Sequence, residues 1–261
     1  MDGGTAFLSG RLTEARDCLS DRPFELGPSV HIQALARSFA TSQRLQIPNF
    51  LAPDAAGGLR AYVEESEQWR HLFNSGSRYH EVSCNEWDAL KDCERNKVLR
   101  VIDETAAYDF QYQYDTIRVA EDPAERRKSN TMLDRFAQFL SSKDVLRLLM
   151  RITGSDDLAF ADCQATRYRP GDFLTPHTDE LDGMDRKFAY VLSLAPVWLP
   201  RWGGLLHFVG ADGGVEETFT PRFNTLSLFS VGQSHYVSQI ATYAPIARMS
   251  LTGWLRTKPP R

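Results

Sequence analysis

The sequence predicts a mainly β fold supported by N-terminal helices, and three observations lead to this prediction. The chain changes character near residue 155, from helical patterns to short apolar runs separated by Gly, Pro and Asp. These runs recur at roughly 8–12 residues, a spacing typical of a sandwich or jelly roll. No internal repeat or low-complexity segment divides the 261 residues. We therefore expect residues 1–154 to form a helical support with a few strands, packed on a β core over 155–261.

The N-terminal half contains both helical and alternating patterns. Apolar side chains three and four residues apart predict helices over 29–42, 53–65, 87–106 and 123–153. Strand-like composition predicts a strand over 44–51, and alternation of side-chain character predicts another over 110–119. These elements are expected to cover the outside of the β core.

The C-terminal half reads as a series of short strands. Its apolar runs include KFAYVLSLAPVWL, NTLSLFSV and RMSLTGWL. The pair Asp212-Gly213 lies between HFVGA and VEETF, and such a dipeptide is a hairpin signal. We predict a β-hairpin there.

Composition excludes several classes of protein. The chain is 42% hydrophobic and 25% charged, which is typical of a soluble globular protein. A net charge of −4 gives no electrostatic reason to expect nucleic acid or an anionic membrane as partner. The four cysteines are scattered without a C-x-x-C pair, which disfavours a disulfide framework or structural zinc. Neither a signal peptide nor a transmembrane run is expected, so we predict a cytoplasmic location.

The segment TPHTDE supplies the first two candidate metal ligands, His177 and Asp179. Residues i and i+2 of an extended backbone point to the same side, so both side chains can meet at one ion. His235 follows 58 residues later at the start of another predicted strand. Two histidines and one carboxylate on one face of an octahedron leave three open positions, the arrangement of iron(II) oxygenases. An isolated H-x-D also arises by chance, and His207 competes with His235 as third ligand.

Arg248 is the candidate for binding a carboxylate. It lies 13 residues after His235 in the apolar strand RMSLTGW, where a charge needs a partner. A guanidinium can hold a carboxylate through two hydrogen bonds. Ser250 is two residues further along and should face the same way. Tyr168 precedes a predicted Pro-Gly-Asp turn, and a strand–turn–strand would bring it beside the ligands.

Further side chains are candidates for the mouth of the site. The aromatic candidates, which a β core would equally need, are Trp198, Trp202, Phe208 and Tyr236. Four arginines are candidates for binding an acidic or peptide substrate, with a solvated face as the more common alternative: Arg167, Arg169, Arg186 and Arg201.

The motifs YRPGDFLTPHTDE, RKFAYVLSLAPVW, RWGGLLHF, FNTLSLFSVGQSHYVSQI and RMSLTGWL resemble the 2-oxoglutarate and iron(II)-dependent oxygenase superfamily. The likeness covers about residues 160–257 and is greatest to the prolyl-hydroxylase-like branch, which includes hydroxylases of a ribosomal-protein proline. It implies a double-stranded β-helix (jelly roll). It further implies iron(II) on His177, Asp179 and His235, and 2-oxoglutarate on Arg248 with Tyr168 and Ser250 assisting. Ascorbate is a further expectation.

The sequence departs from the family pattern in two places. Leu174 stands three residues before His177, where many relatives have an aromatic residue. Ser193 stands near the position at which many relatives have a tyrosine. Tyr190 is three residues away and so on the opposite face of a regular strand. These differences concern the co-substrate contacts rather than the metal ligands.

The resemblance implies a dioxygenase that hydroxylates a substrate C–H bond with O₂ and 2-oxoglutarate, releasing succinate and CO₂. A prolyl residue of a protein is the expected substrate, and a free amino acid or other small molecule is the alternative. A cupin-type metal enzyme that does not use 2-oxoglutarate would share the β architecture. A binding module that kept the fold without the activity is a third alternative. The sequence does not predict an oligomeric state.

Overall fold

The computed structural model describes residues 24–28, 31–76 and 78–259. The start of the helix expected over 29–42, and the N-terminal segment in which no signal peptide is expected, lie outside these ranges. Among the described helices, none combines the length and the apolar character needed to cross a membrane.

The strands of the described residues form one sheet of thirteen, and every pairing is antiparallel. From the N-terminal half come β1 (Arg44–Pro48), β2 (Arg70–Ser75), β3 (Arg78–Ser83) and β4 (Tyr112–Arg118). The C-terminal half supplies β5 (Phe160–Ala161), β6 (Gln164–Tyr168), β7 (Phe173–His177), β8 (Arg186–Ser193), β9 (Leu206–Val209), β10 (Val215–Phe219), β11 (Thr225–Ser230), β12 (His235–Val237) and β13 (Arg248–Arg256).

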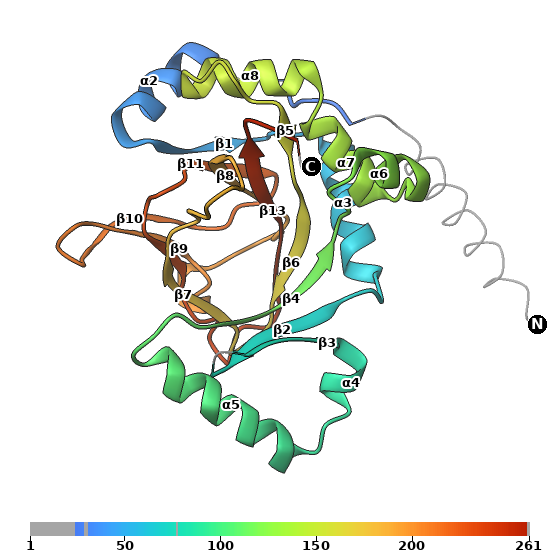
Figure 1. Ribbon diagram of the computed structural model, residues 1–261, viewed down its shortest axis with the longest axis vertical. Helices are drawn as coiled ribbons and strands as arrows, with labels where there is room; N and C mark the ends of the chain where they lie inside the picture. The colour runs from blue at the N-terminus through green and yellow to red at the C-terminus, as the bar shows by residue number, and fades with distance from the viewer. Residues whose placement is uncertain (1–23, 29–30, 77, 260–261) are drawn as a thin grey trace, which may run out of the picture.

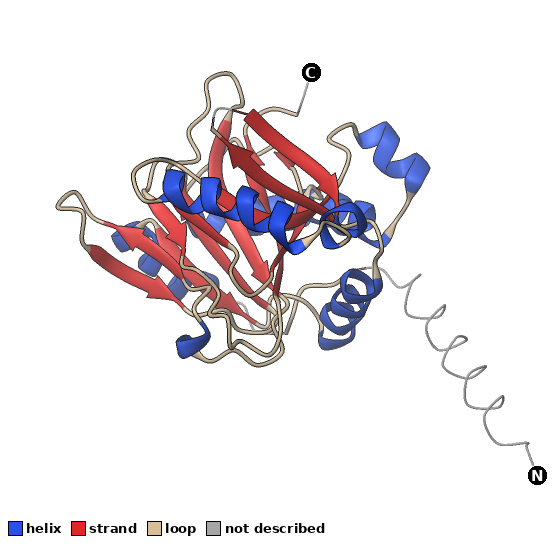
Figure 2. Ribbon diagram, turned by 90° about the horizontal axis from the view of Figure 1, so that it is seen from below, coloured by secondary structure: helices blue, strands red, loops and turns tan. Residues whose placement is uncertain are grey.

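The sheet curls into a nearly closed barrel. Its main path runs β1-β11-β8-β13-β6-β4-β7-β12-β9-β10, while β2, β3 and β5 branch from it. The two ends, β1 and β10, are joined by side chains: Arg44 on β1 binds Glu216 and Glu217 on β10 at 2.9 and 2.7 Å. Figures 1 and 2 show the curled sheet with helices outside it. The predicted mainly β jelly roll is confirmed.

Seven helices of the described chain surround the barrel: α2 (Ile32–Ser42), α3 (Pro53–Glu65), α4 (Cys84–Asp88), α5 (Asp92–Ala106), α6 (Pro123–Ser129), α7 (Met132–Leu140) and α8 (Lys143–Thr153). In Figure 1, α2 and α8 lie side by side above β1, and α4 and α5 lie at the opposite end. The main core forms where helices meet the outer face of the sheet, with Phe39, Phe136 and Leu149 against Leu192 and Leu228. Full burial of each such side chain contributes about 1.5–3 kcal/mol.

The period of two along the strands separates this core from the barrel interior. On β13, Met249 and Leu251 belong to the helix-covered core, whereas Arg248 and Thr252 line a cavity inside the barrel. On β8, Tyr190 packs in the helix-covered core and its hydroxyl donates to the Asp162 carbonyl at 2.7 Å. Tyr190 thus lies mainly on the opposite face from Ser193, as predicted.

The structure corrects several expected elements. The helix expected over 123–153 is three helices, because Asn130 takes a left-handed conformation and Ser142 caps a new start. The helix expected over 87–106 is α4 followed by α5. Strands β2 and β3 were not predicted; they form a hairpin whose turn contains Gly76 at φ +60°. The predicted hairpin at Asp212-Gly213 is confirmed as β9–β10.

Candidate metal centre and co-substrate cavity

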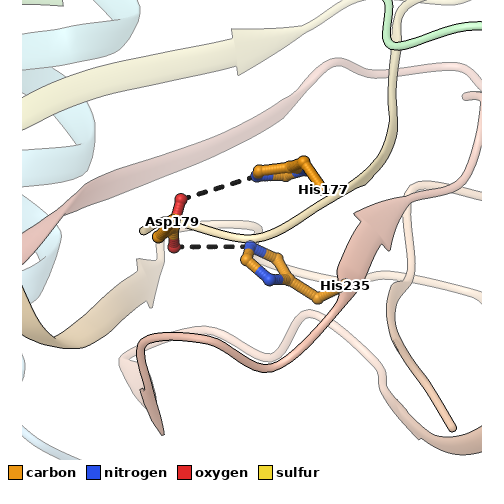
Figure 3. Close-up of side chains that lie close together, drawn as sticks. All are labelled: His177, Asp179 and His235. Carbon is orange, nitrogen blue, oxygen red and sulfur yellow. Dashed lines mark ion pairs between the residues drawn. The ribbon is translucent and has the colours of Figure 1, made fainter. Parts of the chain in front are cut away.

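Two neighbouring strands bring the candidate metal ligands together. His177 ends β7 and pairs directly with His235, the first residue of β12. Asp179 follows two residues after His177, and Figure 3 shows its carboxylate facing both imidazoles. The Asp179 oxygens lie 3.5 Å from Nε2 of His177 and 3.5 Å from Nε2 of His235. One ligand atom from each residue lies within 4.8 Å of the other two.

Each imidazole is oriented by a backbone carbonyl two residues before it. Nδ1 of His177 lies 3.0 Å from the Thr175 carbonyl, and Nδ1 of His235 lies 2.9 Å from the Gln233 carbonyl. A carbonyl only accepts, so each Nδ1 carries the proton and donates it. Both Nε2 atoms therefore present a lone pair toward Asp179. A fixed outer hydrogen bond of this kind is typical of metal-binding histidines.

The charges of the cluster also suit a metal ion. Burial by itself raises the pKa of Asp179, but the close imidazoles of His177 and His235 hold that pKa below its usual value. The group is therefore a carboxylate at neutral pH. Burial and the neighbouring His177 lower the pKa of His235, which favours the neutral donor form. Two neutral nitrogens and one anionic oxygen match the donor set of a 2-His-1-carboxylate site.

His207, the alternative third ligand, lies elsewhere. Its Nδ1 is 2.9 Å from the Thr218 hydroxyl and its Nε2 is 3.2 Å from the Ser238 hydroxyl. Its ring stacks on Tyr236 with centroids 4.6 Å apart. His207 is thus held by the hydroxyls of Thr218 and Ser238, and it does not join the cluster of His177, Asp179 and His235.

Arg248 is a buried cation that faces the same cavity. Its side chain is 3% exposed, and Nε has no hydrogen-bond partner among the described residues. No described carboxylate pairs with its guanidinium, which lies over the Tyr168 ring at 5.3 Å. Burial lowers the pKa of Arg248, but a guanidinium stays protonated at neutral pH. A buried unpaired cation is costly, so this position suits an anionic ligand.

The two assisting candidates have different environments. Tyr168 pairs with Arg248 across β6 and β13, and its ring stacks on Tyr114 at 5.1 Å. Burial raises the pKa of Tyr168, so its hydroxyl stays protonated. The Ser250 hydroxyl is buried and lies 2.9 Å from the Thr166 hydroxyl. The expected strand–turn–strand is present as β6, a turn at 170–171 and β7, although the two strands do not pair with each other, because β4 lies between them.

A cavity of about 480 Å³ connects the metal-ligand cluster with Arg248 and Tyr168, whereas Ser250 is not among the residues that line it. Its lining includes His177, Asp179, His235, Arg248 and Tyr168 from the C-terminal half. The N-terminal half supplies further lining residues that were not predicted from the sequence: Tyr79, Phe110, Tyr112, Tyr114 and Arg118. The alternation of β4, which was predicted as a strand, would have indicated that Tyr112 and Tyr114 share a face.

The predicted aromatic mouth was wrong in its residues. Trp198 and Phe208 are buried in a second apolar cluster, and Trp202 packs against that cluster. Tyr236 stacks on His207 outside the cavity. The rings that do line the cavity include Tyr112, whose pKa burial raises to about 12, and Phe110, whose centroid is 5.6 Å from that of His177. A jelly roll buries its strand aromatics on both faces, which explains the error.

The candidate arginines have separate structural positions. Arg167 and Arg169 bind the buried carboxylate of Asp115 at 2.8 and 3.0 Å, on the outer face of the sheet. Asp115 also accepts from His71 at 2.8 Å, and His71 is a buried residue of β2. Arg186 stacks on Trp254 at 3.5 Å, and Arg201 is exposed.

Asp162, behind Trp254, makes stability depend on pH. Burial raises the pKa of Asp162 to about 6, whereas an unfolded aspartate has a pKa of about 3.9. Between these values the folded state binds more protons, so this contribution to the unfolding free energy is lost as pH rises through about 6. We expect Asp162→Asn to remove that loss in urea unfolding measured from pH 5 to 8. An unchanged pH slope in the variant would contradict this origin.

Sequence comparisons support one family. Residues 163–256 match the model of the 2OG-Fe(II) oxygenase superfamily. Prolyl 3-hydroxylase OGFOD1 of Xenopus laevis is 31% identical over 161 residues, covering 58% of this chain and 30% of that protein. The Mus musculus protein of the same name is 28% identical over 164 residues, covering 59% and 28%. The chain thus spans under a third of the length of these curated relatives.

Solved structures share the fold. A Pseudomonas putida prolyl-4-hydroxylase superposes with a TM-score of 0.53 at 25% identity, covering 87% of this chain and 99% of that one. A prolyl hydroxylase from Trichoplax adhaerens superposes with a TM-score of 0.55 at 16% identity, covering 95% and 93%. At the lower identity the likeness concerns the fold alone.

The barrel and the match over 163–256 indicate the class: this part of the chain is similar to the 2OG-Fe(II) oxygenase superfamily. Members of this superfamily use iron(II) and 2-oxoglutarate. The likeness is to prolyl hydroxylases in particular, because the sequence relatives and a solved structure at 25% identity carry that name. The predicted family resemblance is confirmed.

Proposed function

We propose that this protein is an iron(II)- and 2-oxoglutarate-dependent dioxygenase that hydroxylates a prolyl residue of a protein. The single observation that carries the proposal is the Arg248 guanidinium, which has no carboxylate partner within the described ranges and faces the cavity that holds His177, Asp179 and His235. A metal-ligand cluster alone suits many enzymes. A buried cation in the same cavity adds a site for a carboxylate, which 2-oxoglutarate supplies.

Each residue has a distinct role in the proposed reaction. His177 and His235 would donate Nε2 lone pairs while their Nδ1 protons stay on backbone carbonyls, and Asp179 would offset part of the ion's charge. Arg248 would bind the distal carboxylate, with Tyr168 beside it and Ser250 held by Thr166. When bound, iron(II) with 2-oxoglutarate and O₂ supplies the oxidation that hydroxylates a C–H bond and releases succinate and CO₂. The protein positions the reactants and excludes water.

The relatives support a protein substrate. The sequence matches carry the name prolyl 3-hydroxylase, and the Trichoplax adhaerens enzyme was solved with a peptide fragment. The experiment supplies purified protein with iron(II), 2-oxoglutarate and proline-containing peptides, and matched peptides with alanine for proline. We expect succinate, and a gain of one oxygen only in the proline peptides.

The outcomes separate the alternatives. Succinate formation with an oxidised free amino acid, and unmodified peptides, would replace the protein substrate by a small molecule. Absence of any succinate would contradict the proposal and favour a cupin-type metal enzyme, in which Arg248 would need another anion. Ascorbate dependence and a cytoplasmic location are further parts of the proposal. Omitting ascorbate from the assay and imaging the tagged protein in cells test them.

A further inference from the structure

The turn that leads into His235 is held by the start of β1. This turn, residues 231–234, connects β11 to β12 and contains Gly232 at φ +97°. Gln233 in the turn receives a hydrogen bond from Nη1 of Arg44 at 2.8 Å. Its side-chain nitrogen donates to the Gln43 carbonyl at 2.7 Å. The Gln233 side chain is therefore anchored at both ends to residues about 190 positions earlier in the chain.

Gln233 is also the residue whose carbonyl orients the His235 imidazole. A shift of this residue would move the acceptor of the Nδ1 proton and hence turn the ring. Two backbone bonds hold the turn independently of Gln233: Val231 N–H to the Lys187 carbonyl, and Val209 N–H to the Ser234 carbonyl. Neither bond involves Gln233, which is held by its side-chain hydrogen bonds with Arg44 and Gln43.

The side chain of Arg44 is held in place by several contacts. Its side chain is 12% exposed, and its Nε and Nη2 bind Glu217 and Glu216 at 2.7 and 2.9 Å. Its guanidinium lies 4.7 Å from the centre of the Phe208 ring. The third nitrogen, Nη1, is thereby aimed at Gln233. The planar guanidinium of Arg44 therefore connects β1 to β10, which is the other end of the sheet. The same group also binds the turn that precedes His235.

The His177 side of the centre is built in the same way. The Thr175 carbonyl accepts the Nδ1 proton of His177. Thr175 is itself anchored by Gln111, whose backbone N–H donates to the Thr175 hydroxyl at 2.7 Å. Gln111, like Arg44, belongs to the N-terminal half. Each imidazole thus donates to the carbonyl of a residue, Thr175 or Gln233, that is itself hydrogen-bonded to the N-terminal half.

We propose that Arg44 is a positioning residue of the metal centre and acts on His235 through Gln233. The inference rests on the proposed metal-binding function. Loss of an outer partner of a metal ligand typically weakens metal binding by about 10–100-fold. Arg44 and Gln233 do not contact the ion themselves, so we expect an effect near the lower end of that range.

The test is a Co(II) titration of the full chain, with Co(II) as the probe for a divalent ion. Gln233→Ala removes the anchor but leaves the Gln233 backbone and the ion pairs of Arg44. Arg44→Met removes the other partner. We expect each to weaken Co(II) binding about tenfold and to change its visible absorption spectrum. The double variant should be no weaker than the weaker single variant, because both changes break one link. Glu216→Gln is the control, since Arg44 keeps Glu217 and Gln233, and should bind as wild type.

The unfolding temperature of the metal-free protein separates positioning from folding. Gln233→Ala should unfold at a temperature close to that of wild type. If Arg44→Met does not fold, the Co(II) affinity of Gln233→Ala tests the proposal by itself. Wild-type Co(II) affinity in Gln233→Ala, an equal loss in Glu216→Gln, or additive losses in the double variant would each overturn the role of Arg44. If wild type binds no Co(II) at all, the metal centre itself, and with it the proposed function, is wrong.

Discussion

His177→Ala is expected to abolish binding of the divalent metal and with it all turnover of 2-oxoglutarate. The change removes one of three ligand atoms, and the two that remain, on Asp179 and His235, hold an ion far less strongly. We expect the affinity for Co(II) or iron(II) to fall by more than about 100-fold, beyond the effect of losing an outer partner. The fold should persist, because His177 belongs to neither the helix-covered core nor the second apolar cluster.

The measurements are metal titration and succinate production, with the unfolding temperature as a check on the fold. His207→Ala is the matched control, since His207 is also a strand histidine but bonds to Thr218 and Ser238. It should bind metal as wild type does. Stoichiometric metal binding and normal turnover in His177→Ala would refute the assignment of this ligand.

Arg248→Ala should weaken binding of 2-oxoglutarate while leaving the metal affinity nearly unchanged. Truncating one partner of a buried charged hydrogen-bonded pair costs about 2–5 kcal/mol, which corresponds to roughly a 30-fold or larger loss of affinity. The metal ligands do not touch Arg248, so their geometry should survive. Arg248→Lys should bind with intermediate affinity, because it keeps the charge but loses the two-point geometry.

Calorimetric titration of Co(II) into the metal-free protein measures the metal affinity, and titration of 2-oxoglutarate into the Co(II)-loaded protein measures the co-substrate affinity. Arg201→Ala serves as the control, because Arg201 is exposed. An unchanged affinity for 2-oxoglutarate in Arg248→Ala would place the co-substrate elsewhere in the cavity. A loss of metal affinity as large as the loss of 2-oxoglutarate affinity would instead indicate general damage to the barrel.

Much of the site followed from local spacing in the sequence. His177 and Asp179 are two residues apart, and the strand period alone places them on one side. Arg248 stood out because its strand is otherwise apolar, and the structure does place it buried, without a carboxylate partner in the part of the chain that it describes. The resemblance to known oxygenases added the order of the motifs, and therefore the expectation of a jelly roll.

What the sequence did not predict depends on contacts between distant segments. The hairpin of β2 and β3 was missed although Ser75-Gly76 is a turn signal. The position of β4 between β6 and β7 is a property of the sheet order, which strand patterns do not specify. The hydrogen bond from Arg44 to Gln233 joins residues 189 positions apart. Neither residue looks unusual in its own segment.

The most direct test of the proposed metal and co-substrate site is a crystal structure with Mn(II) and 2-oxoglutarate, grown without oxygen. We predict one anomalous peak in contact with Nε2 of His177, Nε2 of His235 and the Asp179 carboxylate, and a co-substrate carboxylate on Arg248. A metal bound at other residues, or a 2-oxoglutarate carboxylate away from Arg248 while the metal is in place, would contradict it.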